Sequence, residues 1–224
     1  YGYGGFLERS VTETFIIPLA ACAIWATVRW LDRPRAVLAV GAGVLIGTAV
    51  VFKQTAAIYW PALIVWVAWT AGAKRTRQFV WLSLVGLLIT PIVAFVWLWS
   101  AGALDAAYTT LVSYNVAYLR LGNEGPLEIL NRFAHEVWRR QRDDELWAIG
   151  SLGAVVGCVA ALLRRGSPSG RVASLGVIWF AAALIALAAN GPRFFTTYFM
   201  PPQIPLCLLA AWLFDVAMGS SPRW

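Results

Sequence analysis

The chain has 224 residues, of which 60% are apolar, and it carries a formal net charge of +7. Soluble domains are about half apolar, so this composition, together with thirteen Trp, excludes an ordinary soluble protein and indicates an integral membrane protein. The basic residues lie mainly in short runs between apolar segments. That distribution is typical of membrane topology signals and not of a nucleic-acid-binding face.

Seven apolar segments follow one another along the chain, and we predict that each forms a membrane-crossing helix. The fold class is therefore expected to be all-α, a transmembrane bundle of about seven spans forming one integral-membrane domain over residues 1–224. The chain opens on Tyr1 and enters an apolar run almost at once, so we expect a fragment that lacks N-terminal spans of a longer protein. The segments cover residues 14–31, 36–52, 56–73, 79–103, 146–163, 172–190 and 198–217.

A hairpin of two helices is predicted over residues 36–69. One continuous helix would be about 50 Å long, against a hydrocarbon core of roughly 30 Å. Lys53 near its middle would add about 3 kcal/mol to the cost of insertion. Two helices joined at Lys53 remove both problems, because the ammonium then lies at the membrane surface. Gly43 and Gly47 in the first arm form a small-xxx-small step, which lets helices approach closely.

The links between the segments alternate in basic charge. The first, third and fifth links carry several Lys and Arg, whereas the second carries only Lys53 and the sixth only Arg193. The positive-inside rule then places the N-terminus outside and the C-terminus inside, with the long link 104–145 on the outside.

Amphipathic helices at the membrane surface are expected in this external link. After the start signal Gly125-Pro126, the apolar side chains of residues 127–138 fall on one helical face and the charged ones fall opposite. A helix of this kind should lie flat in the interface. An aromatic-rich second piece at the same depth precedes it and contains Tyr108, Tyr114 and Tyr118.

Metal and cofactor chemistry finds little support in the sequence. The three cysteines lack metal-ligand spacing and are expected to be small buried hydrophobes; they are Cys22, Cys158 and Cys207. A lone His135 cannot build a zinc site, and no nucleotide-binding motif is present. The acidic run 143–145 either holds a divalent cation or does acid–base work, or is a solvated end paired with neighbouring arginines. The sequence therefore leaves open whether a divalent cation binds, and it predicts no other cofactor.

Lys53 and Arg193 are the candidate binding residues, because both cations lie beside aromatic residues in the basic-poor links. An anionic headgroup or phosphate at the outer leaflet would find positive charge there. The alternative is that each only anchors a helix end by snorkelling. Tyr198 either donates to a phosphate or is a belt tyrosine. Glu13 is expected to be a solvated boundary carboxylate without a local partner.

Three stretches together resemble polytopic glycosyltransferases of the GT-C class, the group related to protein O-mannosyltransferases and aminoarabinose transferases. The stretches are VTETFIIPLA, GAGVLIGTAVVFKQTA and GPRFFTTYFMPPQIPLCLLAAWL. The tyrosine-rich piece that contains Asn115 and Tyr118 also fits. The resemblance implies transfer of a sugar from a polyprenyl-phosphate carrier to a glycan, lipid or protein acceptor, at the external face of a bacterial inner (plasma) membrane.

The resemblance also implies roles for particular residues. Lys53, with its neighbour Gln54, and Arg193 would contact the lipid-linked phosphate, while Glu13 and Tyr198 would line the cavity. The catalytic acid of that group would precede Tyr1, so no catalytic residue is assigned on this chain. Two alternatives stay open, namely a multi-span transporter or permease, and a non-catalytic membrane scaffold whose external amphipathic helix docks a partner.

Overall fold

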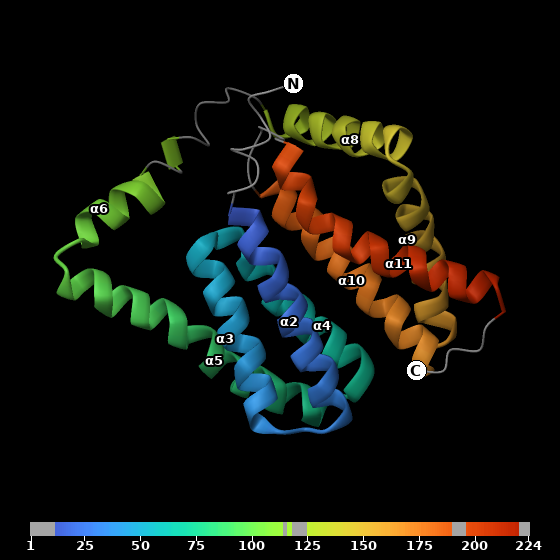
Figure 1. Ribbon diagram of the computed structural model, residues 1–224, viewed down its shortest axis with the longest axis horizontal. Helices are drawn as coiled ribbons and strands as arrows, with labels where there is room; N and C mark the ends of the chain where they lie inside the picture. The colour runs from blue at the N-terminus through green and yellow to red at the C-terminus, as the bar shows by residue number, and fades with distance from the viewer. Residues whose placement is uncertain (1–11, 114–115, 118–124, 190–195, 220–224) are drawn as a thin grey trace.

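The computed structural model of the chain describes residues 12–113, 116–117, 125–189 and 196–219, and all its regular structure there is helical (Figure 1). Two groups of long helices make up the protein. The first contains α2 (Thr12–Asp32), α3 (Ala36–Phe52), α4 (Tyr59–Ala71) and α5 (Ala73–Ser100). The second contains α9 (Glu145–Leu163), α10 (Pro168–Ala188) and α11 (Met200–Ala217). The shorter elements are η2 (Gln54–Ile58), α6 (Leu104–Tyr108), η3 (Thr109–Ser113), α8 (Pro126–Asp143) and η4 (Thr196–Phe199).

Each of the seven predicted apolar segments coincides with one of the long helices, so the all-α fold class is confirmed. Five of the helices in the described residues are long and apolar enough to cross a membrane. The two arms of the predicted hairpin are shorter, since α3 has 17 residues and α4 has 13. The helices support an integral membrane protein, and the count of seven spans stays a prediction.

The predicted hairpin is present, and its first arm packs closely against α5. A Cβ added at Gly43 would lie 2.0 Å from the backbone oxygen of Ser83, and one at Gly47 would lie 2.4 Å from that of Leu87. The reverse contact is equally close, because a Cβ at Gly86 of α5 would lie 2.0 Å from an α3 backbone oxygen. Only residues without a side chain allow this approach, as the small-xxx-small step predicted.

The second group uses glycine in the same way, at positions that the sequence analysis did not single out. On α9, added Cβ atoms at Gly150 and Gly153 would lie 2.7 Å from atoms of Leu206 and Leu209 of α11. α10 then joins the two groups, because it packs against α4 as well as against α9 and α11. Half of the residues in the most apolar 18-residue stretch of α10 are buried, against 17% in that of α5, so α10 is central and α5 is peripheral.

The amphipathic helix predicted in the long link is α8, which lies across the end of the second group (Figure 1). Its apolar face divides in two. Phe133 and Val137 pack against a buried cluster that includes Trp147 and Phe199. Leu127 and Trp138 stay 75% and 66% exposed, so this part of the apolar face has no partner among the described residues, and its position in the membrane interface stays a prediction.

The aromatic-rich piece before α8 forms the short helix α6 followed by the π-helical turn η3. Tyr108 is the last residue of α6 and is 63% exposed. Tyr114, Asn115 and Tyr118 lie outside the described residues, so the second surface-parallel helix stays a prediction.

The expectation that the cysteines are buried was wrong. All three thiol-bearing residues are exposed on the protein surface, namely Cys22, Cys158 and Cys207. The physical reason is that lipid is as apolar as a protein core, so an apolar run in a membrane helix does not say which side chains face other helices.

The prolines near the start of the last span lie at positions that a helix tolerates. Pro201 and Pro202 occupy the first turn of α11, where the missing N–H groups would have no intrahelical partner anyway. Only Pro205 lies inside the helix.

Candidate functional site

Lys53 lies at the tip of the hairpin because α3 ends immediately before it. Its backbone is extended, with φ −158° and ψ 122°, and its N–H still donates to the carbonyl oxygen of Ala49 at 2.9 Å. The turn η2 follows at once and leads into α4. This sharp change of direction aims the side chain away from the axis of α3 and towards the neighbouring helices.

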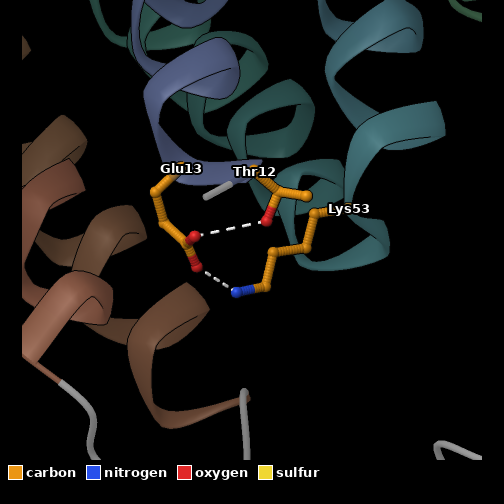
Figure 2. Close-up of polar contacts among 3 residues, drawn as sticks. All are labelled: Thr12, Glu13 and Lys53. Atoms are coloured by element: carbon orange, nitrogen blue, oxygen red, sulfur yellow. Dashed lines mark hydrogen bonds and ion pairs between the residues drawn. The ribbon is translucent and has the colours of Figure 1, made fainter. Parts of the chain in front are cut away.

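The ammonium of Lys53 forms an ion pair with Glu13, in the first turn of α2 (Figure 2). The Glu13 carboxylate also accepts a hydrogen bond from Thr12 Oγ1 at 3.2 Å. The Glu13 side chain is 4% exposed and the Lys53 side chain is 18% exposed, so the ion pair is largely withdrawn from water. The expectation that Glu13 is solvated was therefore wrong, because a partner 40 residues away in sequence, which is not a local one, pairs with it in the fold.

Tyr198 of η4 completes the cluster from the second group of helices. The Lys53 Nζ atom lies 4.1 Å from the centre of the Tyr198 ring, which is cation–π contact. One cation is therefore held between a carboxylate from α2 and an aromatic face from η4. A charge removed from water in this way is stable only with such partners, and removing one partner of a buried pair typically costs 3–5 kcal/mol.

The cluster surrounds a small cavity that Thr55 and Tyr59 also line. Its volume is about 10 Å³, which is close to the space that one water molecule needs. The apolar part of the lining comes from α2, η2, α10 and α11, including Ile16, Ala56, Leu187 and Pro201. A phosphate group is larger than this cavity, so the cavity in this structure does not hold one.

A stacked aromatic pair lies beside the ion pair. The rings of Phe15 and Phe52 are 5.3 Å apart and nearly parallel. Phe52 directly precedes Lys53, and Phe15 lies two positions after Glu13. The stack therefore holds the start of α2 against the end of α3. Both side chains remain about half exposed, at 50% and 46%, so they leave an apolar surface at this end of α2 and α3.

The structure brings together three of the five predicted binding residues, namely Lys53, Glu13 and Tyr198. Gln54 is exposed at the start of η2 and does not line the cavity. Arg193 lies outside the described residues. The sequence analysis did not single out Thr55 and Tyr59, although their spacing of four residues in a helical segment is a signal that they share a face.

The acidic run 143–145 is used mainly in local structure. Asp144 caps α9, because its carboxylate accepts hydrogen bonds from the backbone N–H groups of Leu146 and Trp147. Asp143 pairs with Arg142 at 2.9 Å, and this hydrogen bond lowers the pKa of the Asp143 carboxyl. Over the described residues, no three His, Cys, Asp or Glu side chains gather as a metal-ion site.

The surface helix α8 contacts the same short turn that carries Tyr198. The guanidinium of Arg140 lies 4.7 Å from the centre of the Phe199 ring, which in turn lies 5.7 Å from the ring of Trp147. Phe199 is only 1% exposed. The position of η4 therefore depends on how α8 packs against it, and the position of the Tyr198 ring over Lys53 depends on η4.

Comparison with known families agrees with the resemblance inferred from the sequence. Residues 4–99 match the family model described as dolichyl-phosphate-mannose-protein mannosyltransferase. This range includes Glu13, Lys53, α3, α4 and almost all of α5, and it confirms the similarity to that group over this part of the chain. The similarity supports a membrane glycosyltransferase. No curated protein and no solved structure matches the chain.

Proposed function

We propose that the chain carries the donor-phosphate site of a membrane glycosyltransferase that uses a polyprenyl-phosphate sugar. The observation that carries this proposal is the placement of Lys53, a largely buried cation at the tip of a membrane hairpin. The site lies in a segment similar to a mannosyltransferase family. A lipid-linked phosphate brings negative charge to the headgroup depth, where such a cation is most effective.

The reaction would use Lys53 to stabilise charge on the leaving group. As the bond between the sugar anomeric carbon and the phosphate oxygen breaks, the electron pair passes to the phosphate. An acceptor hydroxyl oxygen forms the new bond to the same carbon and gives its proton to a base. A preorganised ammonium beside the phosphate lowers the energy of this transition state, because it lies in a site with little water.

The surroundings of Lys53 fit the two chemical parts of such a donor. The exposed faces of Phe15 and Phe52 offer an apolar surface for the isoprenoid chain beside the ammonium. In the closed state Glu13 neutralises Lys53, so donor binding exchanges one anionic partner of the ammonium for another. We place this site at the non-cytoplasmic face, with a glycan, lipid or protein as acceptor.

Binding of undecaprenyl phosphate to the purified chain tests the role of Lys53. A hydrogen bond to a charged group contributes about 1.5–3 kcal/mol, so Lys53→Gln should weaken binding by about tenfold or more. Arg164→Gln is the control, because it removes one exposed cation at the C-terminal end of α9 that lines neither the Lys53 cavity nor any other proposed site. Equal affinity of the two variants would remove Lys53 from the site.

A charge-swapped variant separates ligand binding from structural stability. Glu13→Lys combined with Lys53→Glu keeps one charge of each sign in the cluster but moves the cation to α2. We expect this variant to be more stable to heat than either single substitution and still to bind undecaprenyl phosphate poorly. Recovery of both stability and binding would show that the position of the ammonium is unimportant, and it would contradict the proposal.

A further inference from the structure

A second feature that suits an anionic ligand lies at the opposite end of α4 from Lys53. An open groove of about 550 Å³ occupies the corner between α4 and α5. The thirteen residues of α4 span about 20 Å, so this groove and the Lys53 cluster lie near opposite ends of the helix. The groove is lined by Ala68, Ala73, Thr76, Arg77, Val80 and Trp81.

The polar end of the groove is basic. Lys74, Arg75 and Arg77 fall within little more than one turn at the start of α5. Arg75 donates to the backbone oxygen of Leu31 at 3.4 Å and is thereby drawn towards α2. Arg77 is exposed, lines the groove, and forms no ion pair with any of the residues that the structure describes. Its guanidinium is therefore available to an anion in the groove.

The other walls of the groove are apolar. Trp81 is 65% exposed, and its neighbour Val80 faces the same space. The exposed apolar surface continues along α5 through Val85 and Leu88, which are 57% and 47% exposed. An indole ring next to an arginine is the arrangement expected at the boundary between headgroups and acyl chains.

We propose that this corner binds one anionic glycerophospholipid, with its phosphate on Arg77 and an acyl chain along Val80 and Trp81. Charge complementarity selects this occupant, since Arg77 lines the groove, Lys74 and Arg75 lie in the same turn of α5, and apolar side chains form the other walls. The acyl chain of a lipid would cover the apolar surface next to the charged end, whereas a free phosphate would leave that surface uncovered. The site is separate from the donor site proposed above and does not depend on it.

Native mass spectrometry of the purified chain, released from mixed vesicles of phosphatidylglycerol and phosphatidylcholine, measures this binding. We expect preferential retention of one phosphatidylglycerol molecule. Arg77→Gln should lower this retention about fivefold, the effect expected for one basic residue at a lipid surface. Arg171→Gln is the control, because Arg171 is an exposed cation in the first turn of α10 and does not line the groove. Its loss should change retention less than twofold.

A second variant tests the space and leaves the charge unchanged. Ala68 is exposed and lines the groove, so Ala68→Phe should fill it without disturbing the core and should lower phosphatidylglycerol retention as Arg77→Gln does. Equal losses for Arg77→Gln and Arg171→Gln would show only a diffuse surface charge and would overturn the proposal. Unchanged retention in Ala68→Phe, or equal retention of phosphatidylcholine by the natural chain, would do the same.

Discussion

Replacing Gly43 by alanine tests the tightest contact in the fold. An added Cβ would lie 2.0 Å from the backbone oxygen of Ser83 and 2.7 Å from the backbone nitrogen of Leu87. Both atoms belong to the backbone of α5, so no side chain can rotate away. The two helices must separate by roughly an ångström to reach ordinary van der Waals distance, along the interface where α3 packs against α5.

The expected loss follows from two opposing effects. Overpacking of a close interface costs about 1–3 kcal/mol, and more when the backbone must move. Replacing Gly by Ala in a helix returns about 1 kcal/mol. Because the clash is with backbone atoms, the cost lies at the upper end of this range, so the net destabilisation should be about 2 kcal/mol, which for a chain of this size lowers the melting temperature by roughly 4–8 °C.

Gly41 supplies a matched control on the same helix. A Cβ added there has no atom within 4 Å, so Gly41→Ala keeps the gain in helix propensity without the clash. Thermal unfolding of the two variants in the same detergent, followed by circular dichroism, measures the difference. A melting temperature for Gly43→Ala equal to or above that of Gly41→Ala would refute the close packing of α3 against α5.

Three further predictions concern the site, a helix cap and the outward faces. Glu13→Gln leaves a largely buried ammonium with only its aromatic contact and should destabilise the protein by about 3 kcal/mol. Adding Lys53→Gln should recover at least about 1 kcal/mol of this stability in a double-mutant cycle, whereas strictly additive effects would contradict the ion pair. Asp144→Ala removes the N-cap of α9 and should cost about 1 kcal/mol in thermal unfolding, whereas no change would mean that the cap contributes nothing. A lipid-soluble maleimide should label all three cysteines of the folded protein in vesicles, and protection of any of them until unfolding would contradict their outward positions, at Cys22, Cys158 and Cys207.

The closed state of the Lys53 cluster bears on how a donor would enter. The cavity beside the ion pair has room for about one water molecule, and the ring of Tyr198 covers the ammonium from a short turn. Because Phe199 in that turn packs beneath Arg140 and against Trp147, movement of α8 would also move Tyr198. We expect variants at the contact between α8 and η4 to change the affinity of Lys53 for its anionic partner.

Local patterns in the sequence were enough to predict the all-helical class and the break at Lys53. They also predicted the surface helix that starts at Pro126. The reason is that helix formation in a membrane depends on length, apolarity and the position of charges and helix starts. These quantities are properties of consecutive residues, so they can be read without knowing what surrounds a segment. The glycine step at Gly43 likewise marked a helix surface suited to close approach.

Only the tertiary structure decided which faces point inward and which charges meet. The spans are apolar on all sides, so their composition does not separate a helix-facing side from a lipid-facing side; the cysteines were placed wrongly for this reason. Glu13 and Lys53 are 40 residues apart, and Tyr198 comes from the other group of helices. A largely buried charge must have partners nearby, but the sequence alone does not say where the folded chain supplies them.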